Sequence, residues 1–370
     1  MKHFFNRSNM TYFPLSERRN KIDITAAALS ADALSPHSFI NSPQLEEKLR
    51  PLATEIKKAR ERGSQVICAF GAHTIKNGLG PLLGEMLKQG WFTHLASNGA
   101  AVIHDWEFAW LGKSGEDVRE NVALGRFGTW EETGLYINLA LASGAYEGLG
   151  YAASVGAMIL GGGINIPKRE ELLESVSIGI KSGNTEKAAA ALDFYALIED
   201  LKIPFGNMPI PHAFRKYSLL AASRELDKPF TCHPMFGHDI IYTHRANRGA
   251  AIGRTAERDF LEFTASVEGL DGGVYLSVGS AVMSPMIFEK ALSMARNSAG
   301  KDAIQNCSIY VVDLQEASWD WSKGEPPIDN PCYYQRYMKT FNRMGCAAHY
   351  ITADNRDFFS CLYKIMAYDT

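Results

Sequence analysis

The sequence of 370 residues has a formal net charge of −3, with 38 Lys and Arg against 41 Asp and Glu, and is 46% hydrophobic. This is the composition of a soluble globular protein, and it gives no bulk electrostatic reason to expect nucleic acid or an anionic membrane as a partner. No apolar run approaches the roughly 20 residues of a membrane-spanning helix, and the N-terminal segment lacks a signal-peptide core. The six cysteines are scattered without a C-x-x-C pair, so we expect reduced core cysteines in a cytoplasmic protein.

The chain order predicts an N-terminal arm over residues 1–45 and a single α/β domain over residues 46–370. An amphipathic helix is expected from Pro43 to about Arg62. After it, strands alternate with helices of 10–15 residues, which favours a doubly wound, mostly parallel sheet. No internal repeat or low-complexity linker divides this part of the chain.

The clearest unit of this pattern lies within residues 65–110. The apolar run Val66–Phe70 breaks at Gly71, a helical pattern follows, and a second apolar run, Phe92–Ala96, breaks into a polar loop. Strand, helix and strand in this order predict a βαβ unit with parallel strands. Open α/β sheets bind ligands outside the carboxyl ends of such strands. The polar side chains expected there are His73, Lys76, Asn77, Asn98, His104 and Asp105.

These polar residues also have a structural interpretation. His73, Lys76 and His104, taken singly, are explained as surface residues beside tight turns. Asp105 is explained as the N-cap of a helix that begins at this point. Their placement at the ends of two neighbouring strands gives a binding role equal weight.

Three glycines, Gly161–Gly163, follow the small apolar segment Tyr151–Leu160. They lack the Lys-Ser/Thr of a P-loop and the spacing of a G-x-G-x-x-G motif. A helix end followed by a glycine break is therefore favoured over a phosphate cradle.

A dense histidine group is formed by His233, His238, Asp239 and His244. Histidine and aspartate are suitable metal ligands, but the spacing matches no established metal motif. A metal-dependent hydrolase is therefore the weakest alternative. Asp239 is expected either to cap the N-terminus of a helix or to hold a cationic group of a substrate.

Lys339 is placed two turns into a helix that is predicted to begin at Pro331, near Tyr333 and Tyr337. Desolvation by aromatic neighbours lowers the pKa of a lysine and makes the neutral amine available as a nucleophile. A solvated helix lysine is the alternative. The preceding loop supplies residues expected to line an aromatic and acidic pocket for an amine: Glu316, Trp319 and Trp321.

Several segments, taken in order, resemble motifs of the deoxyhypusine synthase family. The resemblance runs from about residue 64 to residue 345. It includes the cofactor-contacting loop and helix, the T-T-A-G-G-V-E-E-D motif, the L-G-D-M-I-F-F-H motif, the L-G-G-G-V-V stretch and the R-P-D-E-A-V-S-W-G-K motif. The corresponding segments of this chain are FGAHTIKNGLGPLL, SNGAAVIHD, GHDIIYTH, LSVGSAV and NPCYYQRYMK.

The resemblance implies a Rossmann-like, NAD-binding, deoxyhypusine synthase-like fold and an NAD-dependent transferase. In that family an aminobutyl group of spermidine passes through a lysine imine to a protein lysine, and the imine-forming residue corresponds to Lys339. The resemblance places Asp239, His244 and Tyr337 at the amine substrate and implies a homotetramer. The residues that it places at NAD are His73, Thr74, Asn77, Ser97, Asn98, Gly99, Ala100, His104, Asp105, Gly279 and Ser280.

The chain departs from the family where a polyamine would be held. Residues around Met283–Pro285 stand in place of paired histidines, Tyr333 replaces a carboxylate, and Tyr337 replaces a tryptophan. Loss of acidic groups removes charge-assisted contacts of about 1.5–3 kcal/mol each. The sequence is therefore also compatible with an NAD- or nucleotide-binding protein of the same fold that has lost transferase activity.

Overall fold

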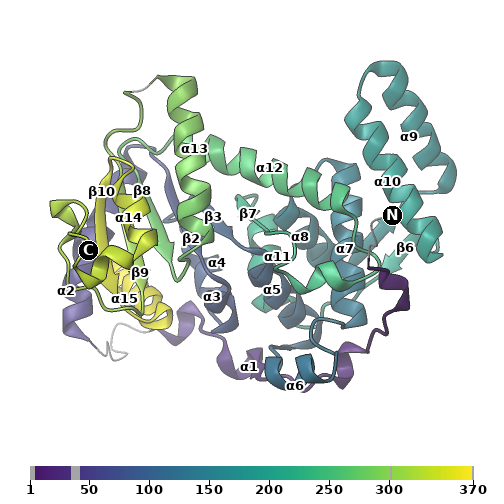
Figure 1. Ribbon diagram of the computed structural model, residues 1–370, viewed down its shortest axis with the longest axis horizontal. Coiled ribbons are helices and arrows are strands. Elements are labelled where there is room, and N and C mark those ends of the chain that lie inside the picture. Colours follow the sequence, from purple (N-terminus) through teal and green to yellow (C-terminus); the bar gives the residue numbers. More distant parts are fainter. Residues whose placement is uncertain (1–4, 35–41, 301, 369–370) are drawn as a thin grey trace. The chain divides into compact units, whose positions relative to one another are not determined.

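The chain is divided between two compact units in the computed structural model, which describes residues 5–34, 42–300 and 302–368 (Figure 1). The sequence analysis expected a single domain after the arm. Most of unit 1 is one insertion between two strands of the unit 2 sheet, and no linker of distinctive composition marks its ends. Unit 1 consists of Met1–Ala26, Val102–Glu225 and Pro234–Asp259, and unit 2 of Ala27–Ala101, Leu226–His233 and Phe260–Thr370.

Unit 2 is built around a six-stranded sheet in which all neighbouring strands are parallel. The strand order is β10-β9-β8-β2-β3-β7, so the chain starts at the centre and builds first one half of the sheet and then the other (Figure 1). This confirms the predicted α/β class with a mostly parallel sheet. The strands are β2 (Val66–Phe70), β3 (His94–Ser97), β7 (Phe230–Cys232), β8 (Val274–Val278), β9 (Ser308–Asp313) and β10 (Ala347–Thr352).

The two central strands, β2 and β8, are buried at every position. Their sequences are nearly continuous apolar runs, as expected of parallel strands that are covered on both faces. Tyr275 of β8 stacks on Phe288 with 4.0 Å between ring centroids, and Phe341 lies 5.9 Å from the same tyrosine. These rings join the sheet to the helices α13 (Met283–Ala299) and α14 (Arg336–Asn342) in one hydrophobic core.

The helix α2 (Pro43–Glu61) agrees with the predicted range, and Ser42 Oγ accepts a hydrogen bond from the Leu45 N–H at its start. The helix expected to begin at Pro331 is interrupted. A 3₁₀ helix, η7 (Pro331–Tyr334), ends at Gln335, and α14 begins only after it. The remaining helices of unit 2 are α3 (Ala72–Lys76), α4 (Gly80–Lys88) and α15 (Asn355–Tyr368).

Unit 1 is mainly helical and has two small antiparallel sheets, β1 (Ile22–Asp23) with β4 (Lys113–Ser114) and β5 (Gly163–Ile166) with β6 (Gly206–Pro209). Two longer helices, α5 (Gly99–Leu111) and α12 (Gly249–Glu268), have residues in both units. The other helices are α6 (Val118–Ala123), α7 (Glu131–Glu147), α8 (Tyr151–Gly161), α9 (Arg169–Ser182), α10 (Thr185–Leu201) and α11 (Leu219–Glu225).

The glycine break expected after Tyr151–Leu160 lies in unit 1. The α8 helix ends at Gly161, and Gly162 follows with a left-handed φ of 68°, so the predicted helix end and glycine break are confirmed. The helix α10 continues through Leu201, and the strand β6 begins at Gly206.

The described part of the N-terminal segment packs within unit 1. Leu15 and Ile24 are buried, and the N–H of Phe13 donates to the carbonyl of Thr129 over 2.9 Å. Arg18 is also buried and reaches Glu107 of α5. Between Leu15 and Ala26 the segment predicted as an arm therefore contributes to the core of unit 1, and from Ala27 the chain belongs to unit 2.

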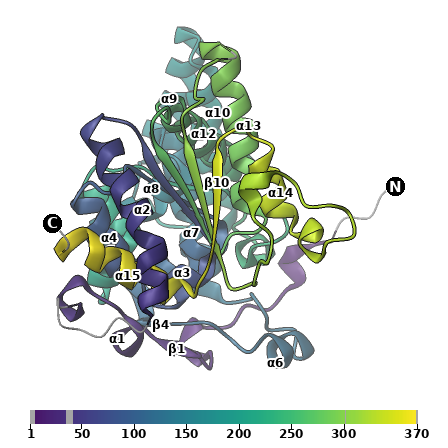
Figure 2. The ribbon, with the colours of Figure 1, turned by 90° about the vertical axis from the view of Figure 1, so that its left-hand side faces the viewer.

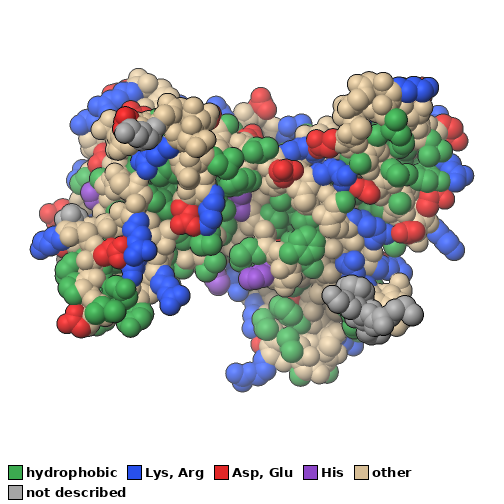
Figure 3. Space-filling model, turned by 45° about the horizontal axis from the view of Figure 1, so that its top comes forward, with side chains coloured by type: hydrophobic (Ala, Val, Ile, Leu, Met, Phe, Trp, Pro, Cys, Tyr) green, Lys and Arg blue, Asp and Glu red, His purple; other side chains and the backbone are tan. Residues whose placement is uncertain are grey.

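The cysteines only partly follow the expectation of isolated core residues. Four are buried free thiols, but Cys307 and Cys346, just before β9 and β10, form a disulfide with Cα atoms 5.2 Å apart. No described helix is long and apolar enough to cross a bilayer. On the face shown in Figure 3, basic and acidic side chains are interspersed, as the small net charge predicts.

Candidate functional site

The carboxyl ends of β2 and β8 lie side by side at the centre of the unit 2 sheet. From β2 the sheet continues through β3 to β7, and from β8 it continues through β9 to β10 in the opposite direction. In open α/β sheets this switch point is where ligands bind. The strand order, counted along the chain, is 3-2-1-4-5-6, which is the order of dinucleotide-binding sheets.

Two glycines lie at this switch point, Gly71 after β2 and Gly279 after β8. The N–H of Gly71 donates to the carbonyl of Val278 over 3.0 Å, and a Cβ on Gly71 would lie 2.0 Å from the carbonyl oxygen of Gly279. Gly279 has a left-handed φ of 58°, and no atom lies within 4 Å of the place where its Cβ would be. The two backbones therefore touch and leave an open space that a side chain would fill.

The N-termini of two helices reach the same edge. The helices α5 and α13 follow β3 and β8 after short connections, and neither has an acidic residue in its first turn. Asn98 Oδ1 accepts from the Ala101 N–H (3.1 Å), and Ser280 Oγ accepts from the Ser284 N–H (3.2 Å). The helix dipoles and the remaining N–H groups favour a bound anion at this edge.

The other residues predicted to contact a cofactor near β2 have protein partners. Ser97 Oγ donates to the carbonyl of Phe70 over 2.7 Å and ties β3 to β2. Asn77 Nδ2 donates to Asn355 Oδ1 (2.9 Å), and Asn355 donates to Thr74 Oγ1 (3.4 Å). Thr74 and Asn77 thus hold α3 against the start of α15. His73 is exposed, and Lys76 is half-buried.

Asp105 and His104 lie inside α5, in unit 1. The expectation that Asp105 caps a helix beginning there is wrong, because α5 starts at Gly99 and continues to Leu111. Asp105 instead caps a helix distant in sequence: its carboxylate accepts from the Leu219 and Leu220 N–H groups and from Ser218 Oγ at the start of α11. Burial raises the pKa of Asp105 to about 6 despite these hydrogen bonds.

His104 belongs to a buried polar cluster around Glu107. His104 Nδ1 lies 2.7 Å from Ser114 Oγ, which donates to Glu107 Oε2 over 2.5 Å. Arg18 forms a bidentate pair with Glu107 at 2.8 and 2.6 Å, and Thr133 Oγ1 donates to the same carboxylate over 2.9 Å. These contacts satisfy the buried carboxylate within unit 1.

Asp239 occupies the N-cap position of the 3₁₀ helix η5 (Ile240–Thr243), but its side chain makes no capping hydrogen bond. It is 9% exposed, and Oδ2 is buried without a hydrogen-bond partner among the described residues. Burial raises the pKa of Asp239 to about 7. Such a carboxyl changes its protonation near neutral pH and is suited to proton transfer or to holding an ammonium group.

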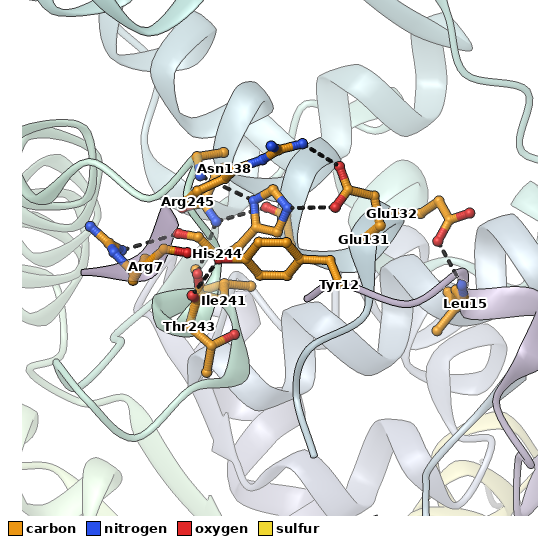
Figure 4. A network of polar contacts seen from close by, with 12 residues as sticks. Arg7, Tyr12, Leu15, Glu131, Glu132, Asn138, Ile241, Thr243, His244 and Arg245 are labelled. Carbon is orange, nitrogen blue, oxygen red and sulfur yellow. Dashed lines mark hydrogen bonds and ion pairs between the residues drawn. The ribbon is translucent and has the colours of Figure 1, made fainter. Parts of the chain in front are cut away.

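His244, also predicted at the substrate, is fixed by a network within unit 1 (Figure 4). Its Nδ1 accepts from the Ala246 N–H (3.1 Å), so Nε2 carries the proton that it donates to Glu131 (3.2 Å). This hydrogen bond is the largest cause of the lowered pKa of Glu131. The Tyr12 ring lies 4.4 Å from the imidazole, and Arg7 donates to the His244 carbonyl over 3.1 Å. His244 thereby anchors the N-terminal segment.

A buried line of hydrogen bonds ends at the carboxyl end of β7 in unit 2. His233 Nε2 lies 3.0 Å from Thr231 Oγ1, which lies 2.8 Å from His94 Nε2. His94 Nδ1 lies 2.7 Å from Ser266 Oγ, and the N–H of His233 donates to the Ser97 carbonyl (2.8 Å). Burial lowers the pKa of both histidines to about 3 and keeps them neutral. His94 is not predicted as a site residue from the sequence, because a lone histidine in an apolar strand has no distinguishing pattern.

The metal alternative has no support in the described residues, among which no group of three or more His, Cys, Asp and Glu side chains could hold an ion.

In unit 2, Lys339 Nζ lies 3.3 Å from the centroid of the Tyr333 ring and 3.7 Å from Glu325. The Tyr337 hydroxyl lies 3.1 Å from that of Tyr350.

Comparisons with known proteins show only distant similarity. No protein-family model and no curated protein matches the sequence. Unliganded AgrE has a TM-score of 0.44 and 13% identity, over 90% of this chain and 34% of AgrE. The arginine dihydrolase ArgZ of the cyanobacterial ornithine–ammonia cycle has a TM-score of 0.42 and 12% identity, over 88% of this chain and 32% of ArgZ. A putative LOR/SDH protein from Methanococcus maripaludis S2 has a TM-score of 0.41 and 10% identity, over 89% of this chain and 69% of that protein. This chain thus spans about a third of AgrE and ArgZ.

The comparisons correct the predicted family and activity. The similar structures include AgrE, ArgZ and a LOR/SDH protein, and none of these is a deoxyhypusine synthase. The expectation of a deoxyhypusine synthase-like, spermidine- or polyamine-dependent transferase acting through an imine on Lys339 is therefore wrong. The resemblance had rested on short segments at low identity, and most of them mark strand ends and helix starts. Such segments recur wherever a parallel sheet meets its helices.

Proposed function

We propose that the protein binds NAD at the carboxyl edge of the unit 2 sheet, across the ends of β2 and β8. The observation that carries this proposal is the strand order β10-β9-β8-β2-β3-β7 with two touching glycine backbones at its switch point. In sheets of this order a dinucleotide lies across the switch point, with its pyrophosphate at a helix N-terminus.

The residues at this edge fit such a cofactor in outline. The N-termini of α5 and α13 are free of acidic side chains and suit the pyrophosphate, and the space beside Gly279 admits a group that a Cβ would exclude. Asn98 lies directly before α5, and its side-chain amide can donate to a phosphate oxygen bound at this helix N-terminus. The segment after β2 lacks the G-x-G-x-x-G motif, so the fit rests on topology rather than on that motif.

Two further points support an NAD-using enzyme. AgrE, one of the similar structures, has been solved as a ternary complex with ornithine and NAD⁺. NAD supplies a hydride acceptor or donor, and the accompanying proton needs a route. The line from His233 through Thr231 to His94 ends at the same sheet edge and offers one. A small-molecule amine substrate and a homo-oligomer stay predictions.

The proposal is tested by calorimetric titration of NAD⁺ into the wild type and two variants of Ala100, a half-buried residue in the first turn of α5. Ala100→Asp places a negative charge where the pyrophosphate is expected. Because a negative charge at a helix N-terminus interacts favourably with the helix dipole, we expect the fold to be retained. We expect Ala100→Asp to weaken NAD⁺ binding by about tenfold or more, while the isosteric Ala100→Asn binds nearly as well as the wild type.

The thermal melting temperature without NAD⁺ serves as the control for folding and is expected not to fall in Ala100→Asp. NADP⁺ is titrated in parallel to identify which dinucleotide is preferred. Absence of NAD⁺ binding at millimolar concentration would contradict the proposal. Equal affinities of the Asp and Asn variants would place the cofactor elsewhere.

A further inference from the structure

A cavity of about 460 Å³ lies in unit 2 at the sheet edge formed by β10. We refer to it as the edge cavity; Figure 2 looks toward this side of the sheet. Its size is within the range of small-molecule pockets, roughly 300–1,000 Å³. The proposed NAD site does not account for it, since that site lies at the central strands. The lining residues that matter are Lys48 and Glu55 of α2, Tyr310 of β9, His349 of β10, and Trp319 and Trp321 near the 3₁₀ helix η6 (Trp321–Lys323).

Glu55 supplies a buried acceptor to this cavity. Its Oε2 atom is buried and has no hydrogen-bond partner among the described residues. The same carboxylate is hydrogen-bonded to Tyr310; burial first, and then this carboxylate, raise the pKa of the Tyr310 hydroxyl, which therefore stays neutral and donates. A buried carboxylate oxygen without a donor costs free energy that a bound N–H⁺ group would recover.

Aromatic rings line the cavity beside this carboxylate. The Tyr310 ring stacks on His349 with 4.6 Å between centroids, and Trp319 Nε1 donates to the Gly324 carbonyl over 2.9 Å, which fixes the indole. The faces of such rings attract cations. At the exposed rim Lys48 and Asp320 carry opposite charges. The Glu55 carboxylate therefore gives the interior of the cavity a negative charge.

Trp321 adds a donor to the same space. It is 3% exposed, and its Nε1 is buried without a hydrogen-bond partner among the described atoms. The residues that line the cavity thus carry one buried, unmatched acceptor, on Glu55, and one buried, unmatched donor, on Trp321. A ligand that satisfies both must carry a donor and an acceptor of its own.

We propose that the edge cavity binds a small organic ammonium ion that also carries a hydroxyl or carbonyl oxygen. The ammonium group donates to Glu55 Oε2 beside the aromatic rings, and the oxygen accepts from Trp321 Nε1. The aromatic and acidic pocket expected from Trp319 and Trp321 is consistent with this assignment, but the buried carboxylate comes from Glu55 of α2, since Glu316 does not line the cavity.

The test compares three ligands of equal chain length by titration calorimetry on the full-length protein at neutral pH. Aminohexanol carries an ammonium and a hydroxyl group, and hexylamine carries only the ammonium group. Hexanediol carries hydroxyl groups and has no charge. We expect aminohexanol to bind more tightly than hexylamine, and hexanediol to show no binding at millimolar concentration. Saturating NAD⁺ is expected to leave these affinities unchanged, which separates this site from the proposed cofactor site.

Two variants assign the site. Glu55→Gln keeps the shape and an acceptor for Tyr310 but removes the charge, and is expected to weaken aminohexanol binding by about tenfold or more. Glu47→Gln, at an exposed position on the same helix, is the matched control and is expected to have no effect. Hexanediol binding as tightly as the amines, an unchanged affinity in Glu55→Gln, or no binding of aminohexanol to the wild type would each overturn the proposal.

Discussion

Replacing Glu107 by glutamine is expected to lower the free energy of unfolding by about 3–5 kcal/mol. The side chains of Arg18 and Glu107 are 2% and 1% exposed, and their bidentate contact is the centre of the unit 1 polar cluster. Burial by itself raises the pKa of Glu107, but Arg18 and the surrounding hydrogen bonds outweigh it and lower the pKa overall. Glu107→Gln leaves the Arg18 guanidinium buried without the carboxylate that it contacts directly, which is the costly state.

Urea unfolding followed by tryptophan fluorescence measures this loss. Asp193→Asn is the control, because its ion pair with Arg254 is partly exposed (42% for Asp193) and such pairs contribute about 1 kcal/mol or less. The double variant Arg18→Met/Glu107→Leu removes both charges and is expected to be more stable than Glu107→Gln. A loss below about 1 kcal/mol in Glu107→Gln would show that the pair is not desolvated as the structure has it.

The expected result for Glu107 also illustrates what sequence patterns can and cannot predict. The apolar runs of β2 and β8 and the amphipathic α2 were predictable because each is specified by residues within a few positions of one another. Arg18 and Glu107 are 89 positions apart, and no local period links them. The same holds for Asp105, which caps α11 more than a hundred positions later.

The candidate sites follow the same division. The end of β2 at Gly71 was predictable, because strand ends can be read locally, whereas its contact with Gly279 joins segments far apart in the sequence. The edge cavity needed Glu55, which lies 255 positions before Tyr310 on another element (310 − 55). The break of the helix at Gln335 was missed because Pro331 is a sound helix start, and only the 3₁₀ geometry of the next residues ends it.

Replacing Asp239 by asparagine is expected to raise the stability of the protein relative to the wild type, and to raise it more at pH 8 than at pH 5. The folded pKa of Asp239, about 7, lies above the ordinary value of 3.8. Between these values the folded state holds a proton that the unfolded state has lost, so wild-type stability falls as pH rises toward 7 and changes no further above it. From pH 5 to pH 8 this amounts to about 3 kcal/mol, which Asp239→Asn removes.

Urea unfolding of both proteins at several pH values isolates this contribution, because the other groups titrate alike and cancel in the difference. The control, Asp200→Asn at a position 65% exposed, is expected to show a difference that does not vary with pH. If the difference in free energy of unfolding between Asp239→Asn and the wild type did not vary with pH, Asp239 would be ionised over the whole pH range and would have a partner in solution. The ¹³Cγ chemical shift of Asp239, assigned by comparison with the variant, reports the same pKa directly.

The direction in which this pKa moves on ligand binding decides what Asp239 does. A counter-ion for a substrate ammonium group must be ionised in the complex, so a bound amine would lower the pKa of Asp239 well below 7. A proton donor must keep its proton at neutral pH, so its pKa would stay near 7 or rise when a candidate amine is present. The chemical shift of Asp239 followed through that titration therefore separates substrate binding from acid–base chemistry at one carboxyl group.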